Sequence, residues 1–207
     1  MNPGAKRCLV DWAHMILPAL LFVALKASFR GAAGIVAGRA GIDASLGLLA
    51  ADAFSLTVVI WIALKACASE IVGSDSSHNC SARRLIWCAA IGAAAGLAAL
   101  WIGRLLGIHD GTRRSVLSFV VLCLLGPVAE EIIYRGLVLG RGKRLMSEGW
   151  AIVVSALIFG ASHGSPLRMA LAAAAGVLLG CARLRGKTIL APILVHAFMN
   201  GIQFPFG

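Results

Sequence analysis

The chain has 207 residues and carries 19 Lys and Arg against nine Asp and Glu, which gives a formal net charge of +10. Apolar residues make up 59% of the chain and charged residues 14%, and the mean hydropathy is +0.88. These values exclude an ordinary soluble protein and indicate an integral membrane protein with several spans. The basic residues are spread over the loops beside apolar segments, so we expect anionic membrane lipids as their partner and no nucleic acid.

Seven apolar segments have the composition of membrane-crossing helices. In chain order they cover residues 9–25, 46–64, 85–102, 116–139, 150–162, 169–182 and 189–204. The segments between them are short and polar, without a linker that would separate two domains. The sequence therefore predicts an all-α transmembrane bundle of about seven helices, with residues 1–207 as a single domain. Its richness in Ala, Gly and Arg favours a bacterial inner membrane.

The stretch AEEIIYRG, residues 129–136, places three ionisable side chains in the fourth predicted span. Each such group near a bilayer centre costs roughly 2.5 to 3.5 kcal/mol, so a functional reason is expected. Glu131 and Arg135 lie four residues apart and share a helix face, which predicts an ion pair. Glu130 points about 100° away from that face. One glutamate is therefore expected to be paired, and Glu130 is left available for chemistry.

Two further spans carry polar side chains at helical spacing. FGASH places Phe159 and His163 on one face of the fifth span, and HAFMN places His196 and Asn200 on one face of the seventh. A single histidine in such a helix is more often a hydrogen-bonded packing residue, and an intramembrane Asn usually joins two helices. Pro127, shortly before Glu130, is expected to bend its helix where the backbone lines protein or water. Together these features favour a hydrated cavity.

The ordered triple EExxxR, FxxxH and HxxxN resembles the CPBP family of intramembrane proteases, which includes the CAAX prenyl endopeptidases and bacterial immunity and processing proteins. The resemblance covers a protease core at residues 116–203. It implies that Glu130 is the catalytic glutamate, that His163 is its partner, and that His196 and Asn200 lie near the scissile carbonyl. Glu131, Arg135 and Phe159 then have supporting roles, and no metal or other cofactor is expected.

The chemistry of these residues agrees with the resemblance. A poorly solvated carboxylate is a stronger base than one in water and can take a proton from an attacking water molecule. His163 would share or relay that proton. Attack on a peptide bond builds negative charge on the carbonyl oxygen, which His196 and Asn200 could stabilise as hydrogen-bond donors. The expected substrate is a membrane-anchored protein, or one with a C-terminal membrane anchor.

Three alternatives stay open at this level. The two glutamates and two histidines could ligate zinc in a zinc-dependent membrane protease, although the chain has no HExxH motif. The same polar residues could form a proton relay in a transporter, although no internal repeat supports that reading. A membrane immunity protein without catalytic activity could also keep this scaffold.

Overall fold

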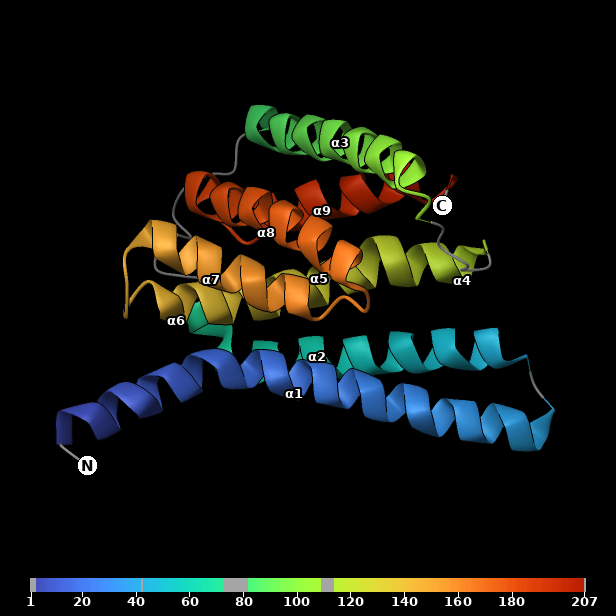
Figure 1. Ribbon diagram of the computed structural model, residues 1–207, viewed down its shortest axis with the longest axis horizontal. Coiled ribbons are helices and arrows are strands. Elements are labelled where there is room, and N and C mark those ends of the chain that lie inside the picture. The colour runs from blue at the N-terminus through green and yellow to red at the C-terminus, as the bar shows by residue number, and fades with distance from the viewer. Residues whose placement is uncertain (1–2, 42, 73–81, 109–113, 207) are drawn as a thin grey trace.

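In the computed structural model, the described part of the chain forms seven helical rods stacked side by side (Figure 1). The described residues are 3–41, 43–72, 82–108 and 114–206. Within them the rods are α1 (Pro3–Ala40), α2 (Ala44–Val72), α3 (Ala82–Leu105), a composite fourth rod, α7 (Glu148–Ala161), α8 (Pro166–Gly186) and α9 (Leu190–Gln203). Five rods are long and apolar enough to cross a membrane, and α7 and α9 are shorter apolar helices. The expectation of an all-α membrane bundle is therefore confirmed.

The first rod continues well past the predicted span at residues 9–25. That apolar window stops at Lys26, and Arg30 follows one turn later. In the structure Lys26 lies 4.0 Å from Glu130, and Arg30 lies 3.2 Å from Asp52. Because acidic partners on other helices compensate these charges, the helix does not need to end where the apolar window ends.

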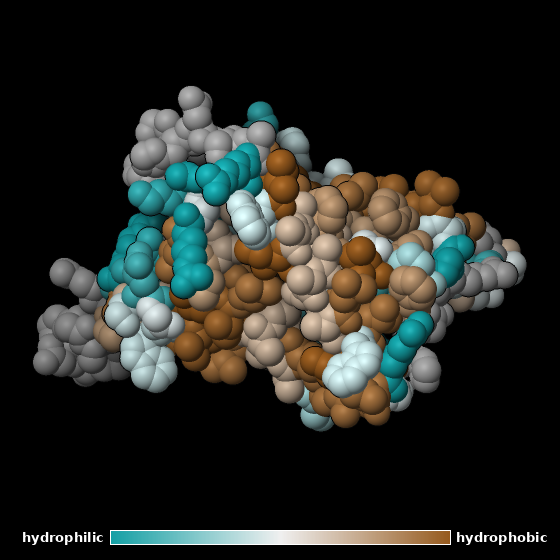
Figure 2. Space-filling model, turned by 90° about the horizontal axis from the view of Figure 1, so that it is seen from above, coloured by the Kyte–Doolittle hydropathy of each residue, from teal (hydrophilic) through white to brown (hydrophobic). Residues whose placement is uncertain are grey.

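The rods are arranged in layers around the fourth one. The hairpin of α1 and α2 forms one outer layer, the fourth rod and α7 lie next to it, and α8, α9 and α3 complete the other side (Figure 1). Figure 2 shows an apolar surface across the middle of one face, with hydrophilic side chains gathered mainly toward one end. This distribution suits a bundle whose helix axes cross a bilayer.

Small residues let two pairs of helices approach closely. A side chain at Gly92 of α3 would overlap the Val195 carbonyl of α9, and one at Gly96 would lie 2.7 Å from the Met199 carbonyl oxygen. On α8, Gly176 packs in the same way against Ala156 of α7. Gly92 and Gly96 belong to the Ala-rich run AIGAAAGLAAL, whose small residues favour tight helix packing in membranes.

The fourth rod alternates between two helical geometries. It runs through α4 (Val116–Phe119), the π-helical η1 (Val120–Leu125), α5 (Gly126–Glu131), the π-helical η2 (Ile132–Val138) and α6 (Leu139–Gly142). Short π-helical turns inside helices are rare and are frequent at functional sites. Glu130 and Glu131 are the last two residues of α5, the short α-helical segment between the two π-helical segments. Both glutamates therefore lie directly before a π-helical turn.

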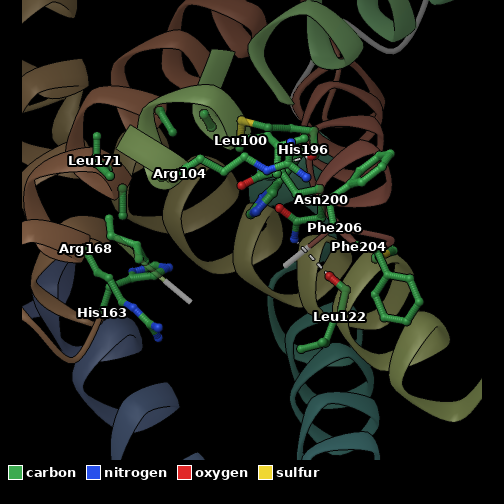
Figure 3. Close-up of a pocket in the computed structure, with 18 of the residues that line it drawn as sticks. Leu100, Arg104, Leu122, His163, Arg168, Leu171, His196, Asn200, Phe204 and Phe206 are labelled. Atoms are coloured by element: carbon green, nitrogen blue, oxygen red, sulfur yellow. Dashed lines mark hydrogen bonds between the residues drawn. The ribbon is translucent and has the colours of Figure 1, made fainter. Parts of the chain in front are cut away.

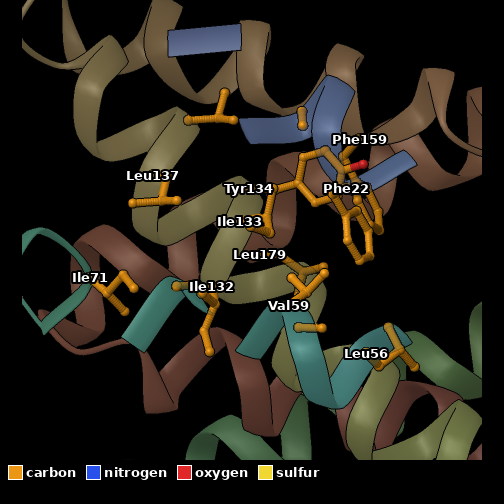
Figure 4. Close-up of a cluster of buried hydrophobic side chains, with 14 of the residues drawn as sticks. Phe22, Leu56, Val59, Ile71, Ile132, Ile133, Tyr134, Leu137, Phe159 and Leu179 are labelled. Carbon is orange, nitrogen blue, oxygen red and sulfur yellow. The ribbon is translucent and has the colours of Figure 1, made fainter. Parts of the chain in front are cut away.

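The hydrophobic core is centred on Tyr134 of η2 (Figure 4). Its ring is fully buried and meets Phe22 of α1 edge-on at 6.1 Å and Phe159 of α7 at 5.1 Å between ring centroids. The hydroxyl of Ser155 on α7 donates a 2.8 Å hydrogen bond to the Tyr134 carbonyl. These contacts fix the fourth rod between the N-terminal hairpin and α7, next to its charged residues.

Candidate active site

Glu131 and Arg135 form a fully buried ion pair. Arg135 Nη1 lies 3.1 Å from Glu131 Oε1, as the four-residue spacing predicts. The guanidinium also donates from Nη2 to the Gly176 carbonyl at 3.2 Å and stands 4.4 Å from the centre of the Phe159 ring. The close approach of α8 at Gly176 and the aromatic face therefore both serve to hold Arg135 at this depth.

His196 connects the two glutamates. Its Nδ1 lies 2.8 Å from Glu131 Oε1, and its Nε2 lies 3.8 Å from Glu130 Oε2. A carboxylate accepts hydrogen bonds, so Nδ1 of His196 donates to Glu131 and the other ring nitrogen is directed toward Glu130. Glu131 therefore has a second partner beyond Arg135, which the sequence did not indicate.

Glu130 sits between an imidazole and a lysine. Its side chain is 16% exposed, with Oε2 toward His196 and Oε1 4.0 Å from Nζ of Lys26 on α1. Within the described part of the chain its ionic contacts are with these two residues, so the imidazole beside Glu130 is that of His196 and not that of His163. Lys26 was missed in the sequence, where its one signal is a charge directly after an apolar segment.

A cavity of about 590 Å³ lies next to this cluster (Figure 3). His163, His196 and Asn200 all line it, so the structure brings together these three predicted site residues. Glu130 is not among the residues that line the cavity; His196 lines it and approaches Glu130 Oε2 at 3.8 Å. Most of the remaining wall is apolar, apart from Arg104, Arg168 and Gln203. A few polar groups in a mostly apolar cavity are typical of a binding site for an organic substrate.

His163 lies just beyond the end of α7. Its Nδ1 is 2.9 Å from the Phe159 carbonyl oxygen and 3.3 Å from the Ser162 hydroxyl, and its ring packs on Phe159 at 4.7 Å between centroids. The predicted common face of Phe159 and His163 is therefore present. If Nδ1 donates to the carbonyl, Nε2 is the nitrogen that remains available for the cavity.

Asn200 makes a hydrogen bond to backbone that explains its position. Its Nδ2 donates to the Leu122 carbonyl at 2.9 Å. In the π-helical turn the Gly126 amide bonds to Val121, five residues earlier, so the next donor in that register would be residue 127. Residue 127 is Pro and has no N–H. Asn200 supplies the missing donor.

The donors of a metal site are not grouped in the described residues. Among them, no three His, Cys, Asp or Glu side chains are placed so that they could hold one ion.

Residues 112–202 match the family described as "Type II CAAX prenyl endopeptidase Rce1-like". "Putative membrane peptidase YdiL" of Bacillus subtilis is 32% identical over 93 residues, which are 45% of this chain and 38% of that protein. "Membrane-embedded CAAX protease MroQ" of Staphylococcus aureus is 26% identical over 100 residues, 45% of this chain and 40% of that protein.

This chain thus spans roughly two fifths of the length of either relative. No solved structure matches it. The matched segment contains all three motifs and every helix from the fourth rod to α9. Residues 112–202 of this integral membrane protein are thus similar to CAAX-type membrane proteases, the resemblance that the three motifs predicted.

Proposed function

We propose that the protein is a membrane-embedded endopeptidase in which Glu130 activates a water molecule for attack on a peptide bond. The observation that carries the proposal is the convergence of Glu130, Glu131 and His196 beside a cavity that His163 and Asn200 also line. The membership of the matched segment in a protease family supports the same reaction class.

The gap between Glu130 and His196 suits a water molecule. At 3.8 Å, Oε2 and Nε2 are too far apart for a direct hydrogen bond, whereas a water seated beside them can contact both groups. Glu131 holds the ring of His196 from the other side, as a carboxylate does for a catalytic imidazole in other hydrolases. His196, which Glu131 holds in place, would thus position the water, and Glu130 would take a proton from it.

The proposed reaction can be described by the transfer of each proton. As the water oxygen bonds to the carbonyl carbon, its proton passes to Glu130, and negative charge develops on the carbonyl oxygen. Asn200 uses one amide hydrogen on Leu122 and has a second that can donate to this oxygen. When the C–N bond breaks, the proton on Glu130 passes to the leaving amine. The second water proton stays on the new carboxyl group and then passes to the amine, so the products are a carboxylate and an ammonium group.

The proposed substrate is a membrane-anchored protein, cut close to or within the bilayer. The apolar cavity wall and the name of the Staphylococcus relative, a membrane-embedded CAAX protease, support this class. Comparative proteomics of membrane and secreted fractions, from cells with the active protein and with Glu130→Gln, should reveal new C-terminal or juxtamembrane ends. A peptide across such a cut site then provides the assay.

In liposomes, Glu130→Gln should lower cleavage of that peptide by at least about 1,000-fold, because the amide cannot take a proton from water. The matched control is Glu148→Gln, which changes an exposed acid on α7 in the same way. Both variants should keep the unfolding temperature and elution profile of the parent protein. Cleavage by a folded Glu130→Gln at the normal rate would rule out the proposed mechanism.

A chelator distinguishes this mechanism from the zinc-dependent alternative. We expect the purified protein to keep its activity after treatment with a chelator strong enough to strip structural zinc. Loss of activity with the chelator, followed by recovery with added zinc, would instead assign the reaction to a bound metal.

A further inference from the structure

Two cations lie in the middle of an apolar helix that the protease motifs do not include. Lys26 and Arg30 are one turn apart on α1, inside its apolar segment Cys8–Ala40. That helix lies entirely outside residues 112–202, the part of the chain that matches the family. Charges at such a depth are costly and mark function unless they have partners.

Arg30 has its own partner on the neighbouring helix. Its Nη1 lies 3.2 Å from Oδ2 of Asp52, whose side chain is almost fully buried on α2. Lys26 lies near Asp52 as well, and its ammonium is 4.0 Å from Glu130 Oε1. Lys26, Arg30 and Asp52 together therefore carry one net positive charge, and the ammonium of Lys26 lies beside the carboxylate that the proposed reaction uses as its base.

The charges around Glu130 balance only if Lys26 is counted. Besides Glu130, the facing groups are Arg30 and Asp52 on the hairpin, Glu131 and Arg135 on the fourth rod, and His196 on α9. With a neutral His196, three cations (Lys26, Arg30, Arg135) stand against three acids (Asp52, Glu130, Glu131). Without Lys26, a net negative charge would stay at membrane depth beside the site.

The two oxygens of Glu130 face different partners. Oε1 faces Lys26 and Oε2 faces His196. At 4.0 Å the lysine attracts the carboxylate without forming a short hydrogen bond, so the oxygen lone pairs remain available to water. A cation that orients the carboxylate and leaves it unblocked suits a general base.

We propose that Lys26 is a positioning residue for Glu130: its ammonium attracts Oε1 and so keeps Oε2 turned toward His196, while Arg30 and Asp52 neutralise each other. The N-terminal helices would then be part of the active site rather than a mere anchor. The kinetic test of this inference rests on the proposed function, whereas a second test measures the contact between Lys26 and Glu130 directly.

The kinetic test compares Lys26→Met, Lys26→Arg and the control Lys65→Met, which removes an exposed lysine from α2. Lys26→Met should lower kcat by at least about tenfold with little change in KM, because the loss concerns the reacting carboxylate. Lys26→Arg should recover most of the rate, and Lys65→Met should behave like the parent. An unchanged kcat in Lys26→Met, or a change in KM alone, would overturn the proposal.

The second test needs no substrate. Unfolding temperatures are measured for Lys26→Met, Glu130→Gln and the double variant in one detergent. Lys26→Met should lower the unfolding temperature of the parent protein. The same substitution should lower the unfolding temperature of the Glu130→Gln variant much less, because the contact is already lost there. Equal shifts in both backgrounds would show that the two residues do not interact. A Glu130→Gln variant that remains active would instead defeat the proposed function and leave this coupling in place.

Discussion

At the residue scale, Glu131 contacts two charged or polar side chains of the site, whereas its spacing along the helix predicts only the contact with Arg135. One of its oxygens accepts from both Arg135 and His196, and all three side chains are buried. Removing one member of a buried charge cluster leaves the others without compensation, which typically costs about 3 to 5 kcal/mol. Glu131 is thus expected to control both the stability of the fourth rod and the orientation of the imidazole.

Glu131→Leu should therefore destabilise the protein by about 3 to 5 kcal/mol, because it leaves the Arg135 guanidinium buried without an acid. The double variant Glu131→Leu/Arg135→Met should recover a large part of that loss, since it removes both charges together. Thermal unfolding in detergent measures the effect. If the double variant is as unstable as the sum of its single substitutions, the pair does not act as a unit.

Helical spacing predicted the local contacts at this scale but not the partners from other helices. The Glu131–Arg135 pair and the shared face of Phe159 and His163 both follow from a separation of four residues. The contacts of Glu130 with Lys26 and of Glu131 with His196 join residues on different rods. Spacing along one helix says nothing about which rod packs beside it or at what height.

At the scale of single elements, the fourth rod depends on a side chain from α9. The π-helical turn leaves the Leu122 carbonyl without a backbone donor because Pro127 occupies the next position, and Asn200 takes its place. A buried carbonyl that loses its donor costs about 1 to 3 kcal/mol. Asn200 thus holds the turn that precedes the two glutamates, in addition to its proposed part in the reaction.

A pair of substitutions tests this account of the turn. Asn200→Ala should destabilise the parent protein by about 1 to 3 kcal/mol because the Leu122 carbonyl is left unbonded. In a Pro127→Ala background residue 127 has an N–H, so the same substitution should cost clearly less. Unfolding temperatures of the four proteins give the answer. An equal cost in both backgrounds would mean that Asn200 does not compensate for the proline.

Hydropathy located every rod but not the limits or the internal geometry of all of them. The predicted segments 189–204 and 150–162 agree with α9 and α7 to within two residues at each end. The windows that ended at residues 25 and 64 were too short because Lys26 and Lys65 lower the local hydropathy while the helices continue. A π-helical turn has the same composition as an α-helical one, so hydropathy carries no signal for η1 and η2.

At the scale of the whole molecule, α3 determines how α9 sits in the bundle. Gly92 and Gly96 bring the backbones of these two helices together, and α9 carries His196 and Asn200. A rigid backbone atom, the Val195 carbonyl oxygen, occupies the space of any side chain at Gly92. The N-terminal half, which lies outside the family match, thus supports the site from two sides, through α3 and through the charged hairpin.

Gly92→Ala should accordingly cost about 1 to 3 kcal/mol, because α3 and α9 must separate to admit a methyl group. The matched control is Gly103→Ala on the same helix, where nothing lies within 4 Å of the new atom. That control should be neutral or stabilising, since Ala favours a helix over Gly by up to about 1 kcal/mol. Thermal unfolding of both variants provides the comparison. A Gly92→Ala protein as stable as the control would show that this helix contact is loose.

The unequal lengths of the rods have a consequence for the lipid around them. The 33-residue apolar segment of α1 would measure about 50 Å, whereas the 14 residues of α7 or of α9 reach only about 21 Å. A typical hydrocarbon layer is about 30 Å thick, so it is too thin for one side of the protein and too thick for the other. Lipids beside α7 and α9 must compress, or headgroups and water must descend toward them, while α1 must tilt. The hydrophobic mismatch is therefore built in, and it would bring headgroups and water closest to the short helices, of which α9 carries His196 beside Glu130.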